Sequence, residues 1–485
     1  MLMLLKELWR SLQYRPEFIG CILFFAMMMM QPINEQYYYK VYSKKHGLEY
    51  HFENKKAGCP NDTGTDNNVT RLMHEVQADV SRFVTRQTLV QSLPPMITLL
   101  FYGPMSDRFG RKPFMILPTC GFLLLMLCLV MIELTGISIL WYNVAGFIAG
   151  CTGFLAGTVS PILSYLTDIV PKEKLAMRIA VIDLIIFFSI AISNMLSGII
   201  LNSFGFLYTF VFMGACFLAS ILLMIIHLKE SLPKEKRTKQ EYHWIKSPKR
   251  IYKLLKVPRS QKWRLKMLLS IDALSFLSGQ VVIGPILLLR LLNSPFCWGS
   301  QGIGFFRGTY FFISGVGAVF AVKVFPKIFH KAFVILISNL SSFGYLVLLG
   351  SFETMTWYYI AIIVGIFSFS TPAMTRSMLG NQVKDHERGA LYAFVSAMQS
   401  LVQTIATFTY QKIYRLADEK GKPQAVFIAI AFALAFPFIL AFIYMTRDIA
   451  YERKERKRKA ENSNEERTAD QKSLHDAKEN DPLIS

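Results

Sequence analysis

Two ionisable side chains stand inside long apolar stretches of this sequence. Asp183 falls in 176–201 and Arg376 in 356–378. An ionised side chain in a bilayer costs about 3 kcal/mol on insertion scales, so it normally faces a cavity or a partner. A partly buried carboxylate can load and release a proton, and a guanidinium can bind a carboxylate or phosphate bidentately. We predict that Asp183 couples protons and Arg376 binds an anion. The alternatives are a structural salt bridge for Asp183 and snorkelling of Arg376 to the interface.

Four more polar residues lie within such stretches. Asp272 in 265–290 and Arg307 in 301–325 are predicted to pair with each other between neighbouring helices. Glu35 and Gln36 stand near the end of the stretch 17–38. We consider them candidates for substrate access, with a plain interfacial position as the alternative.

Recognisable enzymatic or metal-binding machinery is not evident in the sequence. It contains no G-x-x-x-x-G-K-[ST] phosphate loop, no H-E-x-x-H and no Cys/His metal spacing. We therefore predict no enzyme, no metal and no bound cofactor. If the chain moves a solute, an ion gradient or the solute's own gradient must drive the movement.

The composition indicates a membrane protein. Of 485 residues, 53% are hydrophobic and only 18% are charged, whereas soluble proteins carry about 25% charge. This excludes a soluble enzyme, a disordered chain and a secreted disulfide scaffold. Apolar runs long enough to cross a bilayer as helices predict an all-α fold with twelve spans: 17–38, 83–104, 113–134, 138–166, 176–201, 205–228, 265–290, 301–325, 331–351, 356–378, 388–414 and 424–446.

The basic residues predict the orientation of these spans. With a cytosolic N-terminus, 38 of the 53 Lys and Arg residues fall on the cytosolic side and 11 on the other side, as the positive-inside rule requires. Both termini are then cytosolic, and the net charge of +20 reflects topology rather than nucleic-acid binding. The predicted parts are an N-tail (1–16), a six-helix half (17–228), a basic linker (229–264), a second half (265–446) and a disordered tail (447–485).

Several short signals fit this topology. The outer loop 40–82 holds glycosylation sequons at Asn61 and Asn68. Cys59 and Cys297 both fall in outer loops, where a disulfide between them is a reasonable candidate and two free thiols are the alternative. In the tail, Glu479, Leu483 and Ile484 match the acidic dileucine pattern that sorting adaptors read. That match favours endosomes or lysosomes, with the plasma membrane as the alternative.

The turn after the second span carries a signature. It reads Gly103-Pro-Met-Ser-Asp107-Arg-Phe-Gly110-Arg111-Lys112. The glycines permit a tight turn between helices, and Asp107 and Arg111 can pair across it or with neighbouring helix ends as a cytosolic gate. The pattern and its position resemble the signature of the major facilitator superfamily, which implies two six-helix halves.

A narrower resemblance rests on five segments. They are Gln36-Tyr37, Arg178-Ile-Ala-Val-Ile-Asp183, Ser294-Pro-Phe-Cys-Trp298, Thr375-Arg-Ser-Met-Leu379 and Glu387-Arg-Gly-Ala-Leu-Tyr-Ala393. Together they resemble the proton-coupled folate transporter group, solute carrier family 46. The resemblance implies the Cys59–Cys297 disulfide, proton coupling and substrate binding at Asp183 and Arg376, and substrate contacts at Gln36 and Tyr37. Gln280 stands near the place where the folate branch carries a His, and we consider it a further candidate for substrate binding.

The sequence thus predicts a secondary transporter. Protons would drive a bulky organic anion with ring systems, resembling a folate, a peptidoglycan fragment or a nucleotide, across the plasma or lysosomal membrane. Its partners would be that anion, the lipid bilayer and sorting adaptors. A non-transporting receptor or scaffold with the same fold is the alternative, and it would tolerate the loss of Asp183 and Arg376.

Overall fold

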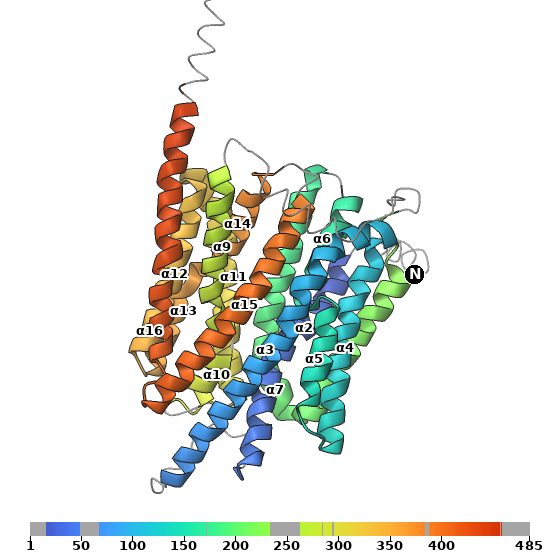
Figure 1. Ribbon diagram of the computed structural model, residues 1–485, viewed down its shortest axis with the longest axis vertical. Coiled ribbons are helices and arrows are strands. Elements are labelled where there is room, and N and C mark those ends of the chain that lie inside the picture. Colours follow the sequence, from blue (N-terminus) through green and yellow to red (C-terminus); the bar gives the residue numbers. More distant parts are fainter. Residues whose placement is uncertain are drawn as a thin grey trace, which may run out of the picture.

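The computed structural model describes residues 16–48, 67–170, 172–232, 262–283, 285–292, 295–383, 388–455 and 457, and this part of the chain is helical, with no strand. With the labels of Figure 1, the helices are α2 (Pro16–Lys45), α3 (Asn67–Phe109), α4 (Arg111–Thr135), α5 (Trp141–Cys151), α6 (Phe154–Ile169), α7 (Lys172–His227), α9 (Lys262–Ile283), α10 (Pro285–Leu292), α11 (Ser300–Ile328), α12 (Lys331–Ser351), α13 (Met355–Val364), the 3₁₀ turn η2 (Gly365–Phe367), α14 (Ser370–Gly380), α15 (Arg388–Glu419) and α16 (Ala425–Ala433). After a break at residue 434, a further helical stretch covers 435–455.

Each of the twelve predicted spans overlaps one of these helices. In the described ranges, eight helices are long and apolar enough to cross a membrane, and one of them, Ile185–His227, contains most of the fifth and of the sixth predicted span. Those two spans meet at Gly205, whose φ of 72° breaks α7 without ending it and is rarely adopted by other residues. The second, seventh and eleventh spans lie in α3, α9 with α10, and α15, which carry more polar side chains. The prediction of an all-helical membrane fold is confirmed.

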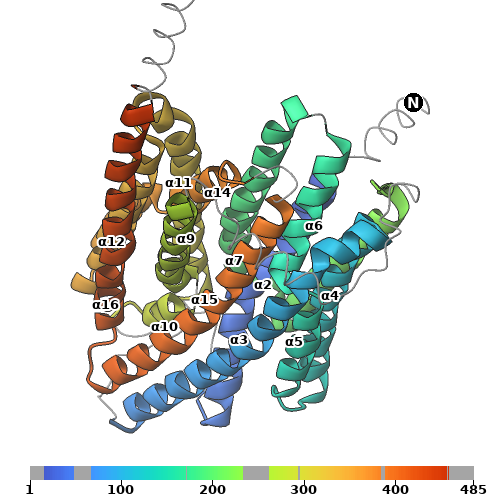
Figure 2. The same ribbon diagram turned by 45° about the horizontal axis from the view of Figure 1, so that its top comes forward.

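The helices form two groups that lie side by side, α2–α7 and α9 with the helices that follow it (Figure 1). The groups touch where α7 crosses α11 and where α3 crosses α15, and the second of these crossings is in the foreground of Figure 2. The start of α2 and the end of the 435–455 helix lie at the same end of the molecule (Figure 1). We call the opposite end the outer end, after the predicted topology.

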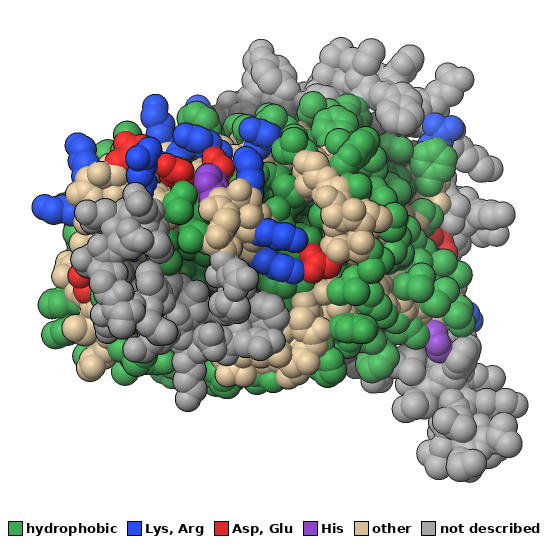
Figure 3. Space-filling view, turned by 90° about the horizontal axis from the view of Figure 1, so that it is seen from below, with side chains coloured by type: hydrophobic (Ala, Val, Ile, Leu, Met, Phe, Trp, Pro, Cys, Tyr) green, Lys and Arg blue, Asp and Glu red, His purple; other side chains and the backbone are tan. Residues whose placement is uncertain are grey.

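The surface matches a membrane setting. Large apolar side chains point outward from the bundle, including Phe204, Phe432 and Phe436, which are 61%, 65% and 66% exposed. Helices satisfy their backbone hydrogen bonds internally, so such a surface is stable against lipid. The outer end instead carries Lys, Arg, Asp and Glu side chains close together (Figure 3). Arg82 and His46 both lie within 3.3 Å of the Asp79 carboxylate there.

The predicted outer loop 40–82 is shorter than the sequence suggested. Helix α2 continues to Lys45, and α3 already begins at Asn67. Polar residues let both helices extend beyond the apolar core, where hydropathy no longer reports their length. Asn68 therefore falls in the first turn of α3, whereas Asn61 and Cys59 lie outside the described residues.

Candidate functional site

The two halves approach closely where α7 crosses α11, and glycines permit it. A Cβ added at Gly198 would lie 2.5 Å from the backbone oxygen of Ser300, and one at Gly304 would lie 2.5 Å from that of Asn194. A Cβ atom does not fit 2.5 Å from a backbone oxygen, so only glycine is accommodated at these two positions. Beside them, the Ser300 hydroxyl donates to Oδ1 of Asn202 at 2.8 Å. The halves are therefore tightly packed near the outer end of this crossing.

A second seam between the halves runs along α3 and α15. Three side-chain contacts join the two helices: Ser81 Oγ to Gln411 Oε1 at 2.6 Å, the Tyr414 hydroxyl to Gln77 Oε1 at 3.1 Å, and His74 Nδ1 to Asp418 Oδ2 at 2.8 Å. They come from the first part of α3 and the last part of α15, which again is the outer end. These contacts between the halves lie in the outer part of the molecule, so the conformation is closed on that side.

A buried ion pair also joins the halves. Arg307 Nη1 of α11 donates to Glu35 Oε2 of α2 at 2.7 Å, and the side chains are only 2% and 5% exposed. Gln31 Nε2 donates to the other carboxylate oxygen at 3.1 Å. The predicted pairing of Arg307 with Asp272 is therefore wrong. Adjacency of spans along the chain suggested that pair, but Arg307 faces the other half instead.

Asp272 belongs to a separate polar cluster in the second half. Its two carboxylate oxygens accept from Thr375 Oγ1 at 2.7 Å and Gln399 Nε2 at 3.0 Å. The next residue after Thr375 is Arg376, which interacts electrostatically with Asp272 and has an exposed side chain. The described part of the chain offers Arg376 no carboxylate at ion-pair distance. An isolated acid in an apolar span was the sequence signal for this cluster, but its partners could not be assigned from spacing.

The signature turn joins helix ends within the first half. Gly110 has the positive φ of 105° that this turn requires, and Arg111 Nε lies 3.0 Å from Asp168 Oδ2 at the end of α6. The first backbone N–H groups of α4, at Arg111 and Lys112, donate to the Glu230 carboxylate at 2.7 and 3.2 Å. A carboxylate at a helix N-terminus is favourable. Arg111 thus pairs with a neighbouring helix end, one of the two predicted arrangements.

Several predicted site residues are not brought together. Tyr37 packs inside the first half, with its ring centroid 5.3 Å from Phe206 and 5.0 Å from Phe210. Gln36 is buried, and its Nε2 donates to the carbonyl of Pro32 in its own helix at 3.3 Å. Gln36 and Tyr37 lie in the outer part of α2, whereas Arg376 on α14 lies near the opposite end of the membrane domain. The predicted substrate-binding residues therefore do not form one site.

Other predictions fall on side chains or residues that the structure does not describe. The backbones of Gly103, Asp107, Asp183 and Gln280 are helical, but the side chains of the last three lie outside the described set. Cys297 is disulfide-bonded, and five other cysteines are free. Because Cys59 lies outside the described residues, the Cys59–Cys297 pairing stays a prediction. The tail with Glu479, Leu483 and Ile484 also lies outside them.

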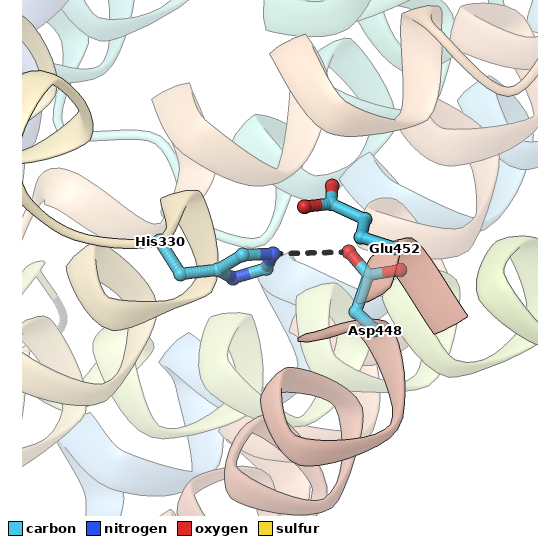
Figure 4. A group of neighbouring side chains, drawn as sticks. All are labelled: His330, Asp448 and Glu452. Carbon is cyan, nitrogen blue, oxygen red and sulfur yellow. Dashed lines mark ion pairs between the residues drawn. The ribbon is translucent and has the colours of Figure 1, made fainter. Parts of the chain in front are cut away.

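At the end opposite the outer end, His330, Asp448 and Glu452 point toward one another (Figure 4), with one ligand atom of each within 4.8 Å of the others. Asp448 is already ion-paired with His330 Nε2 at 3.2 Å and with Arg264. A fixed guanidinium on the central carboxylate disfavours a further cation. These contacts tie together the ends of α9, α12 and the 435–455 helix.

Two helical bundles with a membrane-buried ion pair between them define a multi-pass membrane protein of the secondary-transporter class. The model of the Major Facilitator Superfamily matches residues 84–407 and 269–478, so the chain belongs to this superfamily. Similar proteins include the lysosomal proton-coupled steroid conjugate and bile acid symporter SLC46A3 of Gallus gallus, 24% identical over 400 residues, which are 81% of this chain and 86% of that protein. The probable peptidoglycan muropeptide transporter SLC46 of Drosophila melanogaster is 23% identical over 368 residues, 72% of this chain and 70% of that protein.

Among solved structures, the human organic anion transporter MFSD10 has a similar fold. Its TM-score is 0.62 at 15% identity, and the match covers 89% of this chain and 99% of that one. The resemblance to solute carrier family 46 that five short segments suggested thus extends over most of the chain. The chain is a secondary transporter.

Proposed function

We propose that the protein couples the movement of protons to the movement of an organic anion that carries ring systems. The observation that supports this most directly is the buried Glu35–Arg307 pair between the halves. Such a pair places a titratable group and an anion-binding group at the interface that must open and close during transport.

Aromatic side chains continue from the turn after Arg307 along the interface between the halves. Phe311 is one helical turn after Arg307 on α11, and its ring lies 5.4 Å from that of Phe369. Phe187 from α7 approaches Phe369 from the other half at 6.1 Å. Aromatic faces pack well against ring systems. Steroid conjugates, bile acids and muropeptides, which the names of the similar proteins mention, supply the candidate substrates, and steroid sulfates are the first class to test.

The remaining roles follow from the sequence predictions. Asp183 carries a coupling proton, Arg376 binds the anion near the cytosolic end, and Asp107 with Arg111 gates that end. The protein resides in endosomal or lysosomal membranes, or in the plasma membrane, and sorting adaptors read Glu479, Leu483 and Ile484. Both termini face the cytosol.

An Asp183→Asn variant tests proton coupling. We expect uptake by the parent protein to rise as the outer side is acidified, because the carboxylate must be loaded with a proton from that side. Asn cannot exchange a proton, so uptake by the variant should lose this pH dependence. The measurement is uptake of labelled steroid sulfates, bile acids and muropeptides in cells across a range of external pH.

Two results would contradict this proposal. Parent transport that ignores the proton gradient, or a pH profile unchanged in Asp183→Asn, would contradict the coupling. A protein whose cellular effects survive Asp183→Asn combined with Arg376→Gln would instead be a receptor or scaffold. An untargeted comparison of metabolites in cells with and without the protein would reveal substrates outside these classes.

A further inference from the structure

We infer that a groove between α7 and α11 binds a steroid sulfate from the lipid bilayer, with the rings in the groove and the sulfate at Lys323. The inference rests on the proposed function, because it gives one substrate class a route between the lipid and the carrier. It adds a binding site to those predicted from the sequence. We call this site the lateral groove, and the leaflet at the end opposite the outer end the inner leaflet.

The lateral groove begins where the two halves diverge. A Cβ added at Gly308 on α11 would lie 2.8 Å from the backbone oxygen of Ala191 on α7. Gly315 lies about 10 Å further along α11 at 1.5 Å per residue. There the atoms nearest to an added Cβ belong to the Phe187 side chain and lie at 3.4 Å or more. The two backbones therefore move apart toward the inner leaflet, and side chains line the space between them.

The lateral groove has the size and the lining of a small-molecule site. Its volume is about 360 Å³, within the range of about 300–1,000 Å³ that is typical of ligand pockets. Of the ten described residues that line it, five are Phe, and the others apart from Lys323 are Val or Gly. Aromatic faces pack well against fused rings, so this lining suits a steroid.

The lateral groove faces lipid on one side and the interior of the carrier on the other. Phe312, Val316 and Phe320 follow one another at four-residue spacing on α11 and are about half exposed on the outside of the bundle. Phe311 is buried on the inner side, and its ring lies 5.4 Å from that of Phe369, between η2 and α14. A ligand in the groove is therefore within reach of both the bilayer and the aromatic side chains between the halves.

The two ends of the lateral groove give its occupant a direction. Toward the outer end, the rings of Phe188 and Phe312 meet edge to face with their centroids 5.7 Å apart. Toward the inner leaflet stands Lys323, the one charged residue among the described residues that line the groove. Its side chain is exposed, and no described carboxylate lies at ion-pair distance from it. A Lys near a helix end extends to the membrane interface, where it can meet the sulfate.

The length of the lateral groove favours a steroid sulfate over a phospholipid. Phe312 and Lys323 are 11 residues apart, which corresponds to about 16 Å along α11. Four fused rings with a sulfate span most of this length, and their rigidity keeps the entropic cost of binding small. An extended phospholipid acyl chain is longer, and the Phe188–Phe312 contact stands in its way.

Photo-crosslinking locates the ligand. The full-length protein in phosphatidylcholine nanodiscs is irradiated with a dehydroepiandrosterone sulfate derivative that carries a diazirine on its ring system, and labelled residues are identified by mass spectrometry. We expect labels at Phe188, Val316 and Phe320, and suppression of these labels by unlabelled dehydroepiandrosterone sulfate. Labels that fall only outside 187–188 and 311–324 would overturn the site.

Two substitutions test the apolar and the charged part of the lateral groove. Val316→Trp fills the groove from a position that is 51% exposed, so the fold can accept the larger ring, and labelling should fall by at least about tenfold. Lys323→Gln removes the cation and should lower labelling by about threefold to tenfold, because an ion pair near water is partly screened. Lys323→Arg should label as the parent.

Matched controls lie outside the lateral groove. Val211→Trp places the same ring on a 50% exposed position of α7, and Lys331→Gln removes an exposed cation at the same end of the second half. Both should label as the parent. Unchanged labelling in Val316→Trp and Lys323→Gln, or equal losses in these variants and their controls, would overturn the inference.

Competitors separate a steroid sulfate from other occupants of the lateral groove. Dehydroepiandrosterone without its sulfate should compete at least about threefold more weakly than the sulfate, since it offers Lys323 no charge. Phosphatidylserine in place of part of the phosphatidylcholine should leave labelling unchanged. Labelling that falls with phosphatidylserine but not with dehydroepiandrosterone sulfate would show that the groove holds an anionic phospholipid, and would overturn the inference.

Transport by the same variants separates this inference from the proposed function. We expect Val316→Trp to slow proton-driven uptake of steroid sulfate by about tenfold. If the groove is labelled as described but no anion tested is moved by the proton gradient, the proposed function fails while the binding site stands. If proton-driven uptake of steroid sulfate is equal in the parent, Val316→Trp and Lys323→Gln, the lateral route fails while the function stands.

Discussion

Alanine at Gly304 or Gly198 is expected to keep the outer end of the transporter from closing and to abolish transport. The new Cβ would lie 2.5 Å from the backbone oxygen of Asn194 or Ser300, and backbone cannot move aside as a flexible side chain can. Overpacking of this kind costs about 1–3 kcal/mol, so the closed population should fall by about 5- to 150-fold for each substitution. Steroid sulfate uptake and outer-end spin-label distances measure the two effects.

The matched control is Gly302→Ala on the same helix. The atoms nearest to a Cβ there belong to Trp298 and lie at an ordinary 3.7 Å or more. Alanine is also the better helix former, so a defect at Gly304 cannot come from loss of helix stability. Wild-type uptake and unchanged distances in Gly304→Ala would show that the α7–α11 crossing does not have to close during the transport cycle.

Arg376→Ala is expected to weaken substrate binding by at least about tenfold. Hydrogen bonds to a charged group contribute about 1.5–3 kcal/mol, which corresponds to about 10- to 150-fold in affinity. In the described part of the chain, the exposed Arg376 side chain has no carboxylate at ion-pair distance, unlike Arg290, which is ion-paired with Glu353 at 2.7 Å. The KM for steroid sulfate uptake should therefore rise, with a partial recovery in Arg376→Lys, which keeps the charge but not the bidentate geometry.

Lys331→Ala provides the control for a general loss of positive charge at this end. Lys331 begins α12 at the same end of the second half, is exposed and has no assigned role. An Arg376→Ala protein with an unchanged KM would show that Arg376 only snorkels to the interface. Equal effects of the two substitutions would show that the surface charge, rather than a binding site, attracts the anion.

The sequence predicted the helices well because bilayer thickness fixes their length and composition. Even the short connection between the fifth and sixth spans was located at Gly205. Polar extensions were missed: α2 and α3 project beyond their predicted ends because hydropathy marks only the lipid-facing part of a helix. The break at Gly153, with a φ of 94°, also lies inside a predicted continuous span.

The site was harder to predict because its contacts join distant parts of the chain. Glu35 and Arg307 are 272 residues apart, and only the packing of one half on the other brings them together. Sequence adjacency of the seventh and eighth spans favoured Asp272 as the partner of Arg307 instead. The useful signal was present in the residue types: Glu35 and Arg307 both carry charges within predicted spans. The pair could be assigned only from the structure, in which α2 packs against α7 and α7 crosses α11.

Proton-driven accumulation in liposomes tests the central claim most directly. The purified full-length protein is reconstituted, the compartment facing its outer end is made more acidic, and accumulation of labelled steroid sulfate on the opposite side is measured with and without a protonophore. We predict accumulation above equilibrium that disappears when the protonophore collapses the gradient. Accumulation that is the same with and without the proton gradient would contradict the account.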